Sequence, residues 1–396
     1  MQVYADNAAT TKMSRAAIEA MLPLLDDTYG NPSSLHSAGQ RAKEALEQAR
    51  EIMAQCLGCQ AREIYFTGGG SEADNQAIIS AARQGARQGK KHIVSTAFEH
   101  HAVLHTLKKL EKEGFEVTYL NVHHNGLVSA AEVEASLRPD TCLVTIMYAN
   151  NEIGTIQPIA EIGEVCNRHK VLFHTDAVQA VGHVPIDVKA QKIDMLALSA
   201  HKFHGPKGVG ALYVRRGIAL TNLIEGGAQE RGKRAGTENV PAIVSMSVAL
   251  REACAHLESN AATVSALRDR LIAGLSKIPH GELNGDAQQR LPGNVSFCFE
   301  GIEGESLLLL LDDQGVYASS GSACTSGSLD PSHVLLAIGR PHEVAHGSLR
   351  LTIDAHNTAE EVDYIIDTVT KVVAQLRAMS PVWRDLQNGK RQYVIQ

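Results

Sequence analysis

Short apolar runs alternate with longer segments of helical periodicity through the first half of the chain. Apolar and β-branched runs predict strands, and segments with apolar residues three or four positions apart predict helices. The predicted strands are 63–66, 92–95, 117–122, 142–147, 171–174, 195–198 and 210–214, and the helices between them are 71–87, 102–114, 132–137 and 159–170. This alternation predicts an α/β fold with a mostly parallel sheet, helices on both faces, and a ligand site beyond the carboxyl ends of the strands.

The pattern changes in the last third of the chain. After residue 281 come strands at 295–299 and 347–353 and helices at 305–311 and 359–376. Helices are also predicted earlier in the chain, at 42–57, 241–257 and 263–275. We therefore expect a large domain at 14–257, and a smaller α+β domain that combines 1–13 with 258–396 and carries a loop at about 319–333. We expect the polar tail after Pro381 to be loosely ordered.

Composition limits the class of protein. The chain has 396 residues, 44% of them hydrophobic, which is enough for a sizeable core without disulfides. Its net charge of −7 disfavours nucleic acid and anionic membranes as partners. The start lacks the basic and then apolar pattern of a signal peptide, no apolar run approaches about 20 residues, and the seven cysteines favour reduced thiols. These features predict a cytoplasmic protein that contacts neither membrane nor nucleic acid.

One cysteine pair has the spacing of zinc ligands. Cys56-Leu-Gly-Cys59 lies where the helix predicted at 42–57 meets Gly58, a helix stop signal. A structural zinc site needs four ligands, and the sequence has no second pair of this kind. We therefore interpret the pair as structural and predict no resident metal there.

Three segments carry residue types that suit pyridoxal phosphate chemistry. Lys202 follows the strand at 195–198 and lies among histidines and a Gly-Pro-Lys-Gly turn, where burial and cationic neighbours lower the pKa of a lysine and make it nucleophilic. Asp176 ends another strand, and a carboxylate beside the cofactor's ring nitrogen keeps that nitrogen protonated. Three glycines at 68–70 precede a helix, where free amides suit a phosphate. A single loop lysine is usually structural, so the combination carries the prediction.

Cys324 lies in a run of small residues, 319–328, that has no bulky apolar anchor. Glycine widens backbone freedom, so this composition predicts a thiol on a loop that can move, as a nucleophile or sulfur carrier requires. A Ser/Gly linker with an incidental cysteine is the alternative interpretation of this segment taken alone.

Several motifs together resemble those of the cysteine desulfurases, which are fold-type I, aminotransferase-like pyridoxal phosphate enzymes. They are Ser199-Ala-His-Lys-Phe-His-Gly-Pro-Lys-Gly, His174-Thr-Asp-Ala-Val-Gln, Asn150-Asn-Glu-Ile-Gly, Arg231-Gly-Lys-Arg-Ala-Gly-Thr-Glu-Asn and Ser319-Ser-Gly-Ser-Ala-Cys-Thr-Ser-Gly-Ser. The resemblance runs from residue 4 to residue 381. The cysteine loop is similar to that of the branch that supplies sulfur for iron–sulfur cluster and nitrogenase assembly.

The resemblance implies that L-cysteine is converted to L-alanine while its sulfur passes to Cys324 as a persulfide. The sulfur then goes to an acceptor protein, such as an iron–sulfur scaffold or a thiolation carrier for transfer RNA, and Cys324 is a candidate for transient ligation of a cluster. Lys202 would hold pyridoxal 5'-phosphate and move the Cα proton, and His100 would stack on the ring and act in acid–base steps. The resemblance also implies a homodimer.

The remaining implied roles concern the cofactor and the substrate carboxylate. Asp176 would pair with the ring nitrogen, and Gln179 would contact the 3-oxygen. The phosphate would be held by Gly70, Ser71, Ser199 and His201, and Thr237 would reach the phosphate in the neighbouring subunit. Asn151 and Arg350 would bind the substrate carboxylate, with Asn151 also touching the cofactor.

One position departs from the family pattern. The cysteine desulfurases have a Gly-Arg or Ser-Arg pair where this chain has Asp354-Ala355. Because Arg350 is intact, the departure affects local packing, fine specificity or a partner surface rather than the reaction. The alternative functions are a selenocysteine lyase or cysteine β-lyase on the same scaffold, an aminotransferase in which Cys324 is incidental, and a non-catalytic sulfur-transfer scaffold.

Overall fold

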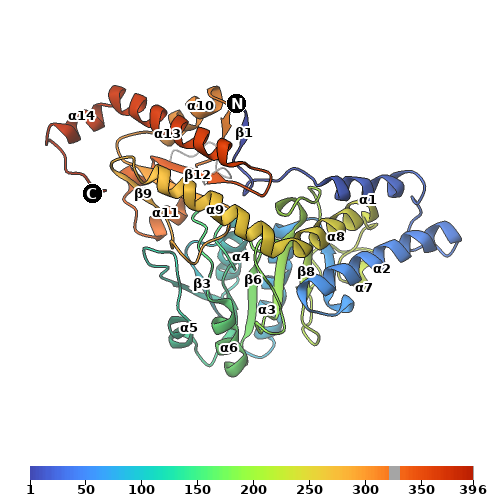
Figure 1. The fold of residues 1–396 in the computed structure, drawn as a ribbon. Helices are drawn as coiled ribbons and strands as arrows, with labels where there is room; N and C mark the ends of the chain where they lie inside the picture. The colour runs from blue at the N-terminus through green and yellow to red at the C-terminus, as the bar shows by residue number, and fades with distance from the viewer. Residues whose placement is uncertain (321–330, 396) are drawn as a thin grey trace.

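A seven-stranded sheet forms the centre of the protein in a computed structural model that describes residues 1–320 and 331–395 (Figure 1). Its order is β2-β8-β7-β6-β5-β3-β4. The strands are β2 (Ile64–Thr67), β3 (His92–Thr96), β4 (Glu116–Leu120), β5 (Thr141–Thr145), β6 (Leu172–Asp176), β7 (Met195–Ser199) and β8 (Gly210–Val214). Among the described strands of this sheet, β8 runs opposite to the other six, since the connection from β7 is too short for a crossover. The predicted mostly parallel sheet is confirmed.

Helices cover both faces of this sheet, as predicted. Alternate residues of the strands enter two different hydrophobic cores: Ile93 and Leu143 belong to one, and Val94 and Val144 belong to the other. The helices that follow the strands are α3 (Gly70–Ala86), α4 (His101–Lys112), α5 (Ala130–Ser136) and α6 (Ile159–His169), and two short turns, η1 (Ala61–Glu63) and η2 (Ala200–Lys202), precede β2 and follow β7.

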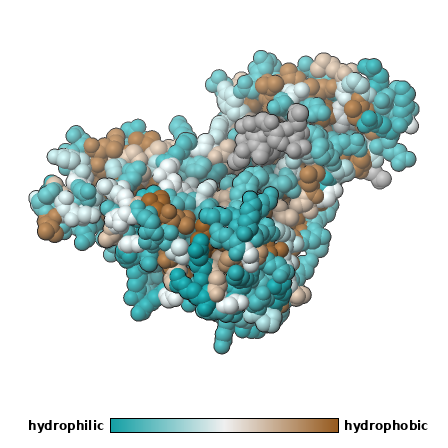
Figure 2. Space-filling model, turned by 180° about the vertical axis from the view of Figure 1, so that it is seen from behind, coloured by the Kyte–Doolittle hydropathy of each residue, from teal (hydrophilic) through white to brown (hydrophobic). Residues whose placement is uncertain are grey.

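Three further helices build an arm beside the sheet. Helices α1 (Arg15–Leu25) and α2 (Ser37–Leu57) pack on α8 (Val240–Ala255), which follows the short α7 (Gln229–Gly232), and they project to one side of the molecule in Figure 1. Gly58 ends α2 with a φ of 73°, so the predicted helix stop is confirmed. Seen from behind, the arm carries hydrophobic surface (Figure 2). Its exposed apolar side chains are Leu22, Leu25, Tyr29 and Leu35.

A third hydrophobic core lies at the other end of the molecule. Helix α9 (Leu257–Leu275) leads into an antiparallel sheet of β9 (Gly281–Leu283), β10 (Asn294–Phe299) and β12 (Ser348–Thr352), covered by α10 (Gly304–Asp313) and α13 (Ala359–Met379). Strand β1 (Val3–Tyr4) pairs in parallel with β11 (Val316–Tyr317), so the N-terminus joins this core. The short helices α11 (His333–Ala337) and α12 (His342–Ala345) instead pack their buried residues into the larger core.

The expectation of a loosely ordered tail is wrong. Residues after Pro381 form α14 (Pro381–Gln387), and Ile395 is 3% exposed. The guanidinium of Arg377 lies 3.9 Å from the ring centre of Trp383, which anchors the helix. The backbone amides of Val394 and Ile395 also donate to the carboxylate of Glu300, and such scattered contacts leave no periodic apolar pattern in the sequence.

None of the helices in the described ranges is, by itself, long and apolar enough to cross a membrane. Helices α8 and α9 pass this test of length and composition only as a pair, and the chain bends by 72° between them. Eight residues of α8 are buried inside the protein: Val240, Ala242, Ile243, Ser245, Met246, Ser247, Ala249 and Leu250.

Candidate active site

Two predicted site residues lie at the carboxyl ends of neighbouring strands. Asp176 is the last residue of β6, and Lys202 ends the turn η2 that directly follows β7. Because β6 and β7 are adjacent and parallel, their carboxyl ends share one edge of the sheet. His100 begins α4 after β3, and its charge acts on Asp176 together with that of Lys202. The structure therefore brings these three residues together.

The N-terminal segment lies over Lys202. The Nζ of Lys202 donates to the carbonyl oxygens of Ala8 at 2.5 Å and Ala9 at 2.9 Å, and Gln179 Nε2 donates to the same Ala8 oxygen at 2.9 Å. His201 accepts at its carbonyl oxygen from the backbone of Thr11 at 2.9 Å. Residues more than 160 positions away in sequence thus hold Lys202, Gln179 and His201, and the sequence analysis did not include these N-terminal residues in the site.

The glycine run forms a close helix start. Gly69 caps α3 with a φ of 150°, a conformation that favours glycine, and a Cβ added to Gly70 would lie 2.6 Å from the side chain of Val178. The Oγ of Ser199 lies 3.9 Å from where a Cβ of Gly69 would be. Gly70, Ser71 and Ser199 therefore meet where the first amides of α3 have no partner within the helix, which is an arrangement suited to an anion.

The electrostatics of Asp176 suit a cationic partner. Burial raises the pKa of Asp176, while the nearby charges of His100 and Lys202 and a hydrogen bond from the Val178 amide (3.0 Å) act in the opposite direction. A buried carboxylate stays ionised only when a positive group pairs with it. A protonated ring nitrogen would be such a group.

Three buried polar residues behind Asp176 were missed by the sequence analysis. His174 Nε2 lies 3.5 Å from an Asp74 oxygen, and its Nδ1 lies 2.8 Å from the hydroxyl of Thr145. Burial, followed by the charges of Asp176 and Glu99, raises the pKa of Asp74 well above its usual value. Burial also raises the pKa of Glu99 to about 8 and lowers that of His174 to about 3. The sequence did indicate His174, because it lies two residues before Asp176 on the same strand, and residues two apart on a strand share a face.

Arg350 comes from the second sheet and meets the first domain. It is 3% exposed in β12, and its Nη2 donates to Asp6 at 2.9 Å while its Nη1 donates to the backbone oxygen of Asn151 at 3.2 Å. Its Nε is buried without a hydrogen-bond partner among the described residues. Asn151 and Arg350 are therefore adjacent, and a guanidinium can pair with a carboxylate through two parallel donors.

Cys324 lies outside the described residues, but the residues that flank its segment are placed. Ser319 exchanges backbone hydrogen bonds with Arg350, at 2.6 and 3.2 Å. On the other side, the hydroxyl of Ser332 donates to Glu152, and His333 Nε2 donates to the backbone oxygen of Glu99 at 3.0 Å. Both flanks are thus held beside elements that carry site residues.

Thr237 is the predicted site residue that the described contacts do not join to the others. It is exposed on residues 233–239, between α7 and α8. Within one subunit, the described contacts do not join Thr237 to the helix start at Gly70. This placement agrees with a role toward a second subunit and does not test it.

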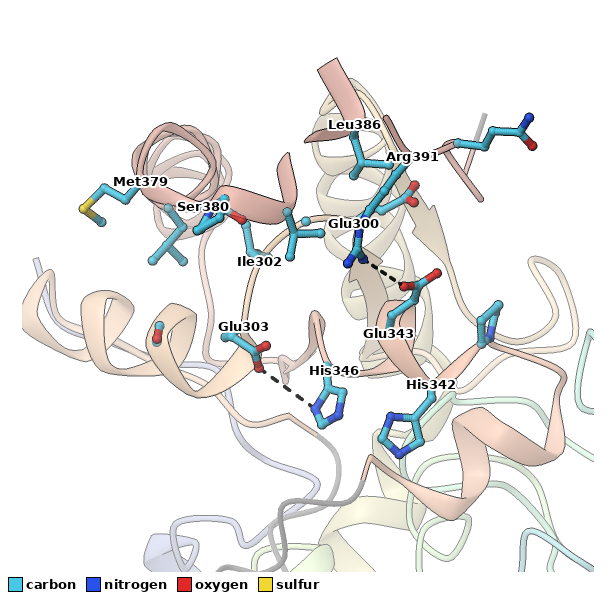
Figure 3. A pocket seen from close by; sticks show the side chains of 17 residues that line it. Glu300, Ile302, Glu303, His342, Glu343, His346, Met379, Ser380, Leu386 and Arg391 are labelled. Carbon is cyan, nitrogen blue, oxygen red and sulfur yellow. Dashed lines mark ion pairs between the residues drawn. The ribbon is translucent and has the colours of Figure 1, made fainter. Parts of the chain in front are cut away.

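The pocket in Figure 3 is a separate feature. It has a volume of about 1030 Å³ and lies between α12, the end of α13 and α14, where Arg391 pairs with Glu343 at 3.6 Å. None of the predicted site residues lines it, and no lysine is among the residues that line it. The chemistry gathers instead at the edge of the large sheet.

Comparisons with known proteins give consistent results. The class-V aminotransferase family model matches residues 3–365. A cysteine desulfurase IscS of Methanosarcina thermophila is 55% identical over 380 residues, which cover 96% of this chain and 94% of that protein, and one of Clostridium botulinum is 52% identical over 394 residues, 99% of each.

Two solved structures are similar over most of their length. A NifS-like protein superimposes with a TM-score of 0.89 at 38% identity, covering 95% of this chain and 100% of that one. The structure of SspA in complex with cysteine superimposes with a TM-score of 0.79 at 38% identity, covering 90% of this chain and 99% of that one.

Proposed function

Because this chain belongs to the class-V aminotransferase family and, within it, to the cysteine desulfurases, we propose that Lys202 holds its cofactor and that Cys324 receives the sulfur. The enzyme depends on pyridoxal 5'-phosphate, as the members of this family do. The observation that carries the assignment of Lys202 is its position beside Asp176 at the edge of two parallel strands.

The residues at this edge fit the cofactor. The glycine helix start would hold the phosphate, and the buried Asp176, whose burial disfavours its charge, would pair with the ring nitrogen. Gln179 and His201 both hydrogen bond to the N-terminal segment that also holds Lys202. When bound, the cofactor would supply an electron sink for the charge that develops at the substrate Cα.

The residues of the chain then divide the work. Arg350 would bind the substrate carboxylate beside Asn151, and Lys202 would move the Cα proton. The Cys324 thiolate attacks the substrate sulfur, so a sulfur–sulfur bond forms while the Cβ–sulfur bond breaks. Protons return to the carbon side, and the products are L-alanine and a persulfide on Cys324. L-Cysteine as substrate agrees with the cysteine bound in the SspA structure.

One incubation tests this assignment against the other enzymes on the same scaffold. The purified enzyme is given L-cysteine, alanine and sulfide are measured, and persulfide is mapped by mass spectrometry. Equimolar alanine and sulfur with a persulfide on Cys324 is expected. Pyruvate and ammonia without persulfide would establish elimination chemistry, and alanine that forms only with an added keto acid would establish an aminotransferase.

We also propose a homodimer that shares its active sites. Thr237 is exposed, and the arm of α1 and the residues after it exposes Leu22, Leu25, Tyr29 and Leu35. A cluster of exposed apolar side chains marks an interaction surface. Sedimentation analysis should give the mass of a dimer, and Leu25→Glu should weaken it. A monomer at working concentrations with full activity would contradict the shared site.

The persulfide requires an acceptor, which we propose to be an iron–sulfur scaffold protein that Cys324 contacts and with which it transiently shares a cluster. We place the reaction in the cytoplasm, where the six described cysteines, all of them free, would stay reduced. Transfer of labelled sulfur from the enzyme to a candidate scaffold, followed by mass spectrometry, would test the acceptor.

A further inference from the structure

Three potential metal ligands meet next to the active site. His204 lies two residues after Lys202, and Asp354 and His356 lie four and six residues after Arg350. The His204 Nε2 lies 3.8 Å from one Asp354 oxygen, and the His356 Nδ1 lies 3.3 Å from the other. One ligand atom of each residue lies within 4.8 Å of those of the other two. Two imidazoles and one carboxylate thus converge from the two domains.

His204 is fixed in the orientation that a metal ligand needs. Its Nδ1 lies 2.9 Å from the backbone oxygen of Lys12, and a carbonyl oxygen can only accept, so Nδ1 carries the proton. In the neutral ring, Nε2 then presents its lone pair toward Asp354. A second hydrogen bond of this kind orients most metal-binding histidines. The His204 backbone is also held at a φ of 64°, with its amide donating to Thr11 Oγ1 at 2.8 Å.

The spacing between His204 and Asp354 suits a shared metal ion better than a hydrogen bond. At 3.8 Å, His204 Nε2 is too far from the carboxylate for a hydrogen bond. Around a tetrahedral ion with bonds of about 2.0–2.1 Å, neighbouring ligand atoms lie roughly 3.3 Å apart. The amide of His356 donates to Asp354 Oδ1 at 2.7 Å and fixes the carboxylate, while the exposed ring of His356 leaves the site open to solvent.

We propose that His204, Asp354 and His356 bind a divalent transition metal such as Zn²⁺, with water at the remaining position. Nitrogen and carboxylate donors in this number suit Zn²⁺, Co²⁺ and Ni²⁺. This site goes beyond the desulfurase reaction and does not depend on the cofactor. It also gives a role to Asp354, at which the chain departs from the pattern of the cysteine desulfurases. A bound metal would connect the turn after Lys202 with the strand of Arg350.

The test measures metal binding to the holoenzyme in a Cys324→Ala background, because a thiolate also binds zinc. After chelation and dialysis, Zn²⁺ is titrated by calorimetry, and bound metal is counted by elemental mass spectrometry. One ion per subunit is expected. Asp354→Gly and His204→Asn, which tolerates a positive φ, should each weaken binding by at least about 10-fold, and His342→Ala is the matched surface control.

Two further readouts separate the proposed site from other zinc ligands. Zn²⁺ should raise the melting temperature of the parent and of His342→Ala but not of Asp354→Gly or His204→Asn, and circular dichroism checks that each variant is folded. Co²⁺ should give visible bands without thiolate charge transfer. Unchanged affinity in folded Asp354→Gly and His204→Asn, absence of binding in the Cys324→Ala background, or a cobalt–thiolate spectrum would overturn the proposal.

Discussion

His174 and Asp74 face each other at 3.5 Å in the interior of the protein, behind the strand end that carries Asp176. Both side chains are almost completely buried, at 0% and 1% exposure. Burial lowers the pKa of His174 to about 3 and raises that of Asp74 well above its usual value, so burial disfavours the charged form of each side chain. The interior of the protein therefore works against an ion pair here, although the two residue types would allow one.

The first prediction concerns the charge of Asp74. Burial disfavours the charge of Asp74, and Asp74→Asn replaces the carboxyl group by an uncharged amide of the same shape, so the free energy of unfolding should change by no more than about 1 kcal/mol. Urea denaturation at pH 7 measures it, with Asn75→Ala as a neighbouring control on the same helix. A loss of about 3–5 kcal/mol would instead show that Asp74 is charged and paired with His174.

The second prediction concerns pH and Glu99. Its pKa is about 8 in the folded protein, against 4.5 for an ordinary glutamate, because burial disfavours the charge. Between these values the folded state keeps a proton that the unfolded state has lost, so the stability contributed by Glu99 falls as pH rises.

Glu99→Gln should remove this dependence. Urea midpoints at pH 6.5 to 8.5 should fall more steeply with pH in the parent than in the variant. This range lies above the pH at which His174, with its lowered pKa, contributes the opposite slope. Parallel profiles for the two proteins would contradict the raised pKa of Glu99.

The third prediction concerns Lys202. Lys202→Ala removes the amine that we propose holds the cofactor and moves the Cα proton, so alanine formation should fall by about 10³-fold or more. The cofactor should also leave on dialysis, which absorbance of the dialysed protein measures. Lys207→Ala, an exposed lysine in the same turn, is the control and should keep both properties. Normal turnover by Lys202→Ala would remove this residue from the chemistry.

The fourth prediction concerns Cys324. Cys324→Ala should still bind L-cysteine, seen as a change in the cofactor spectrum, but should form neither persulfide nor alanine at a normal rate. Cys254→Ala, which changes a cysteine on α8, should behave as the parent. Persulfide transfer to an acceptor at an undiminished rate in Cys324→Ala would show that another thiol carries the sulfur.

The fifth prediction concerns substrate binding by Arg350. Arg350→Lys keeps the charge but loses the planar pair of donors, so KM for L-cysteine should rise by roughly 10-fold to 100-fold. The change in kcat should be smaller, because the proton transfer residues are intact. Steady-state kinetics measure both values, with the exposed Arg384→Lys as control. An unchanged KM would place the substrate carboxylate elsewhere.

The sequence was sufficient to predict features that depend on neighbouring residues. The strand before Asp176, the strand before Lys202 and the glycine helix start each have a local pattern, and each lies where it was predicted. Contacts between distant residues have no such pattern. Nothing near Ala8 indicates that it accepts from Lys202, and nothing near Asp6 indicates Arg350. These pairings arise only when two domains and a terminus fold together.

The pairing of β1 with β11 has a consequence for how the enzyme is made. Strand β1 cannot pair until residues 316–317 have been synthesised. The large sheet ends at Val214, so a chain leaving the ribosome can complete this sheet about one hundred residues before β1 has a partner. The carbonyl oxygens that hold Lys202 belong to the N-terminal segment that follows β1. A nascent chain therefore acquires a finished lysine site only near the end of translation.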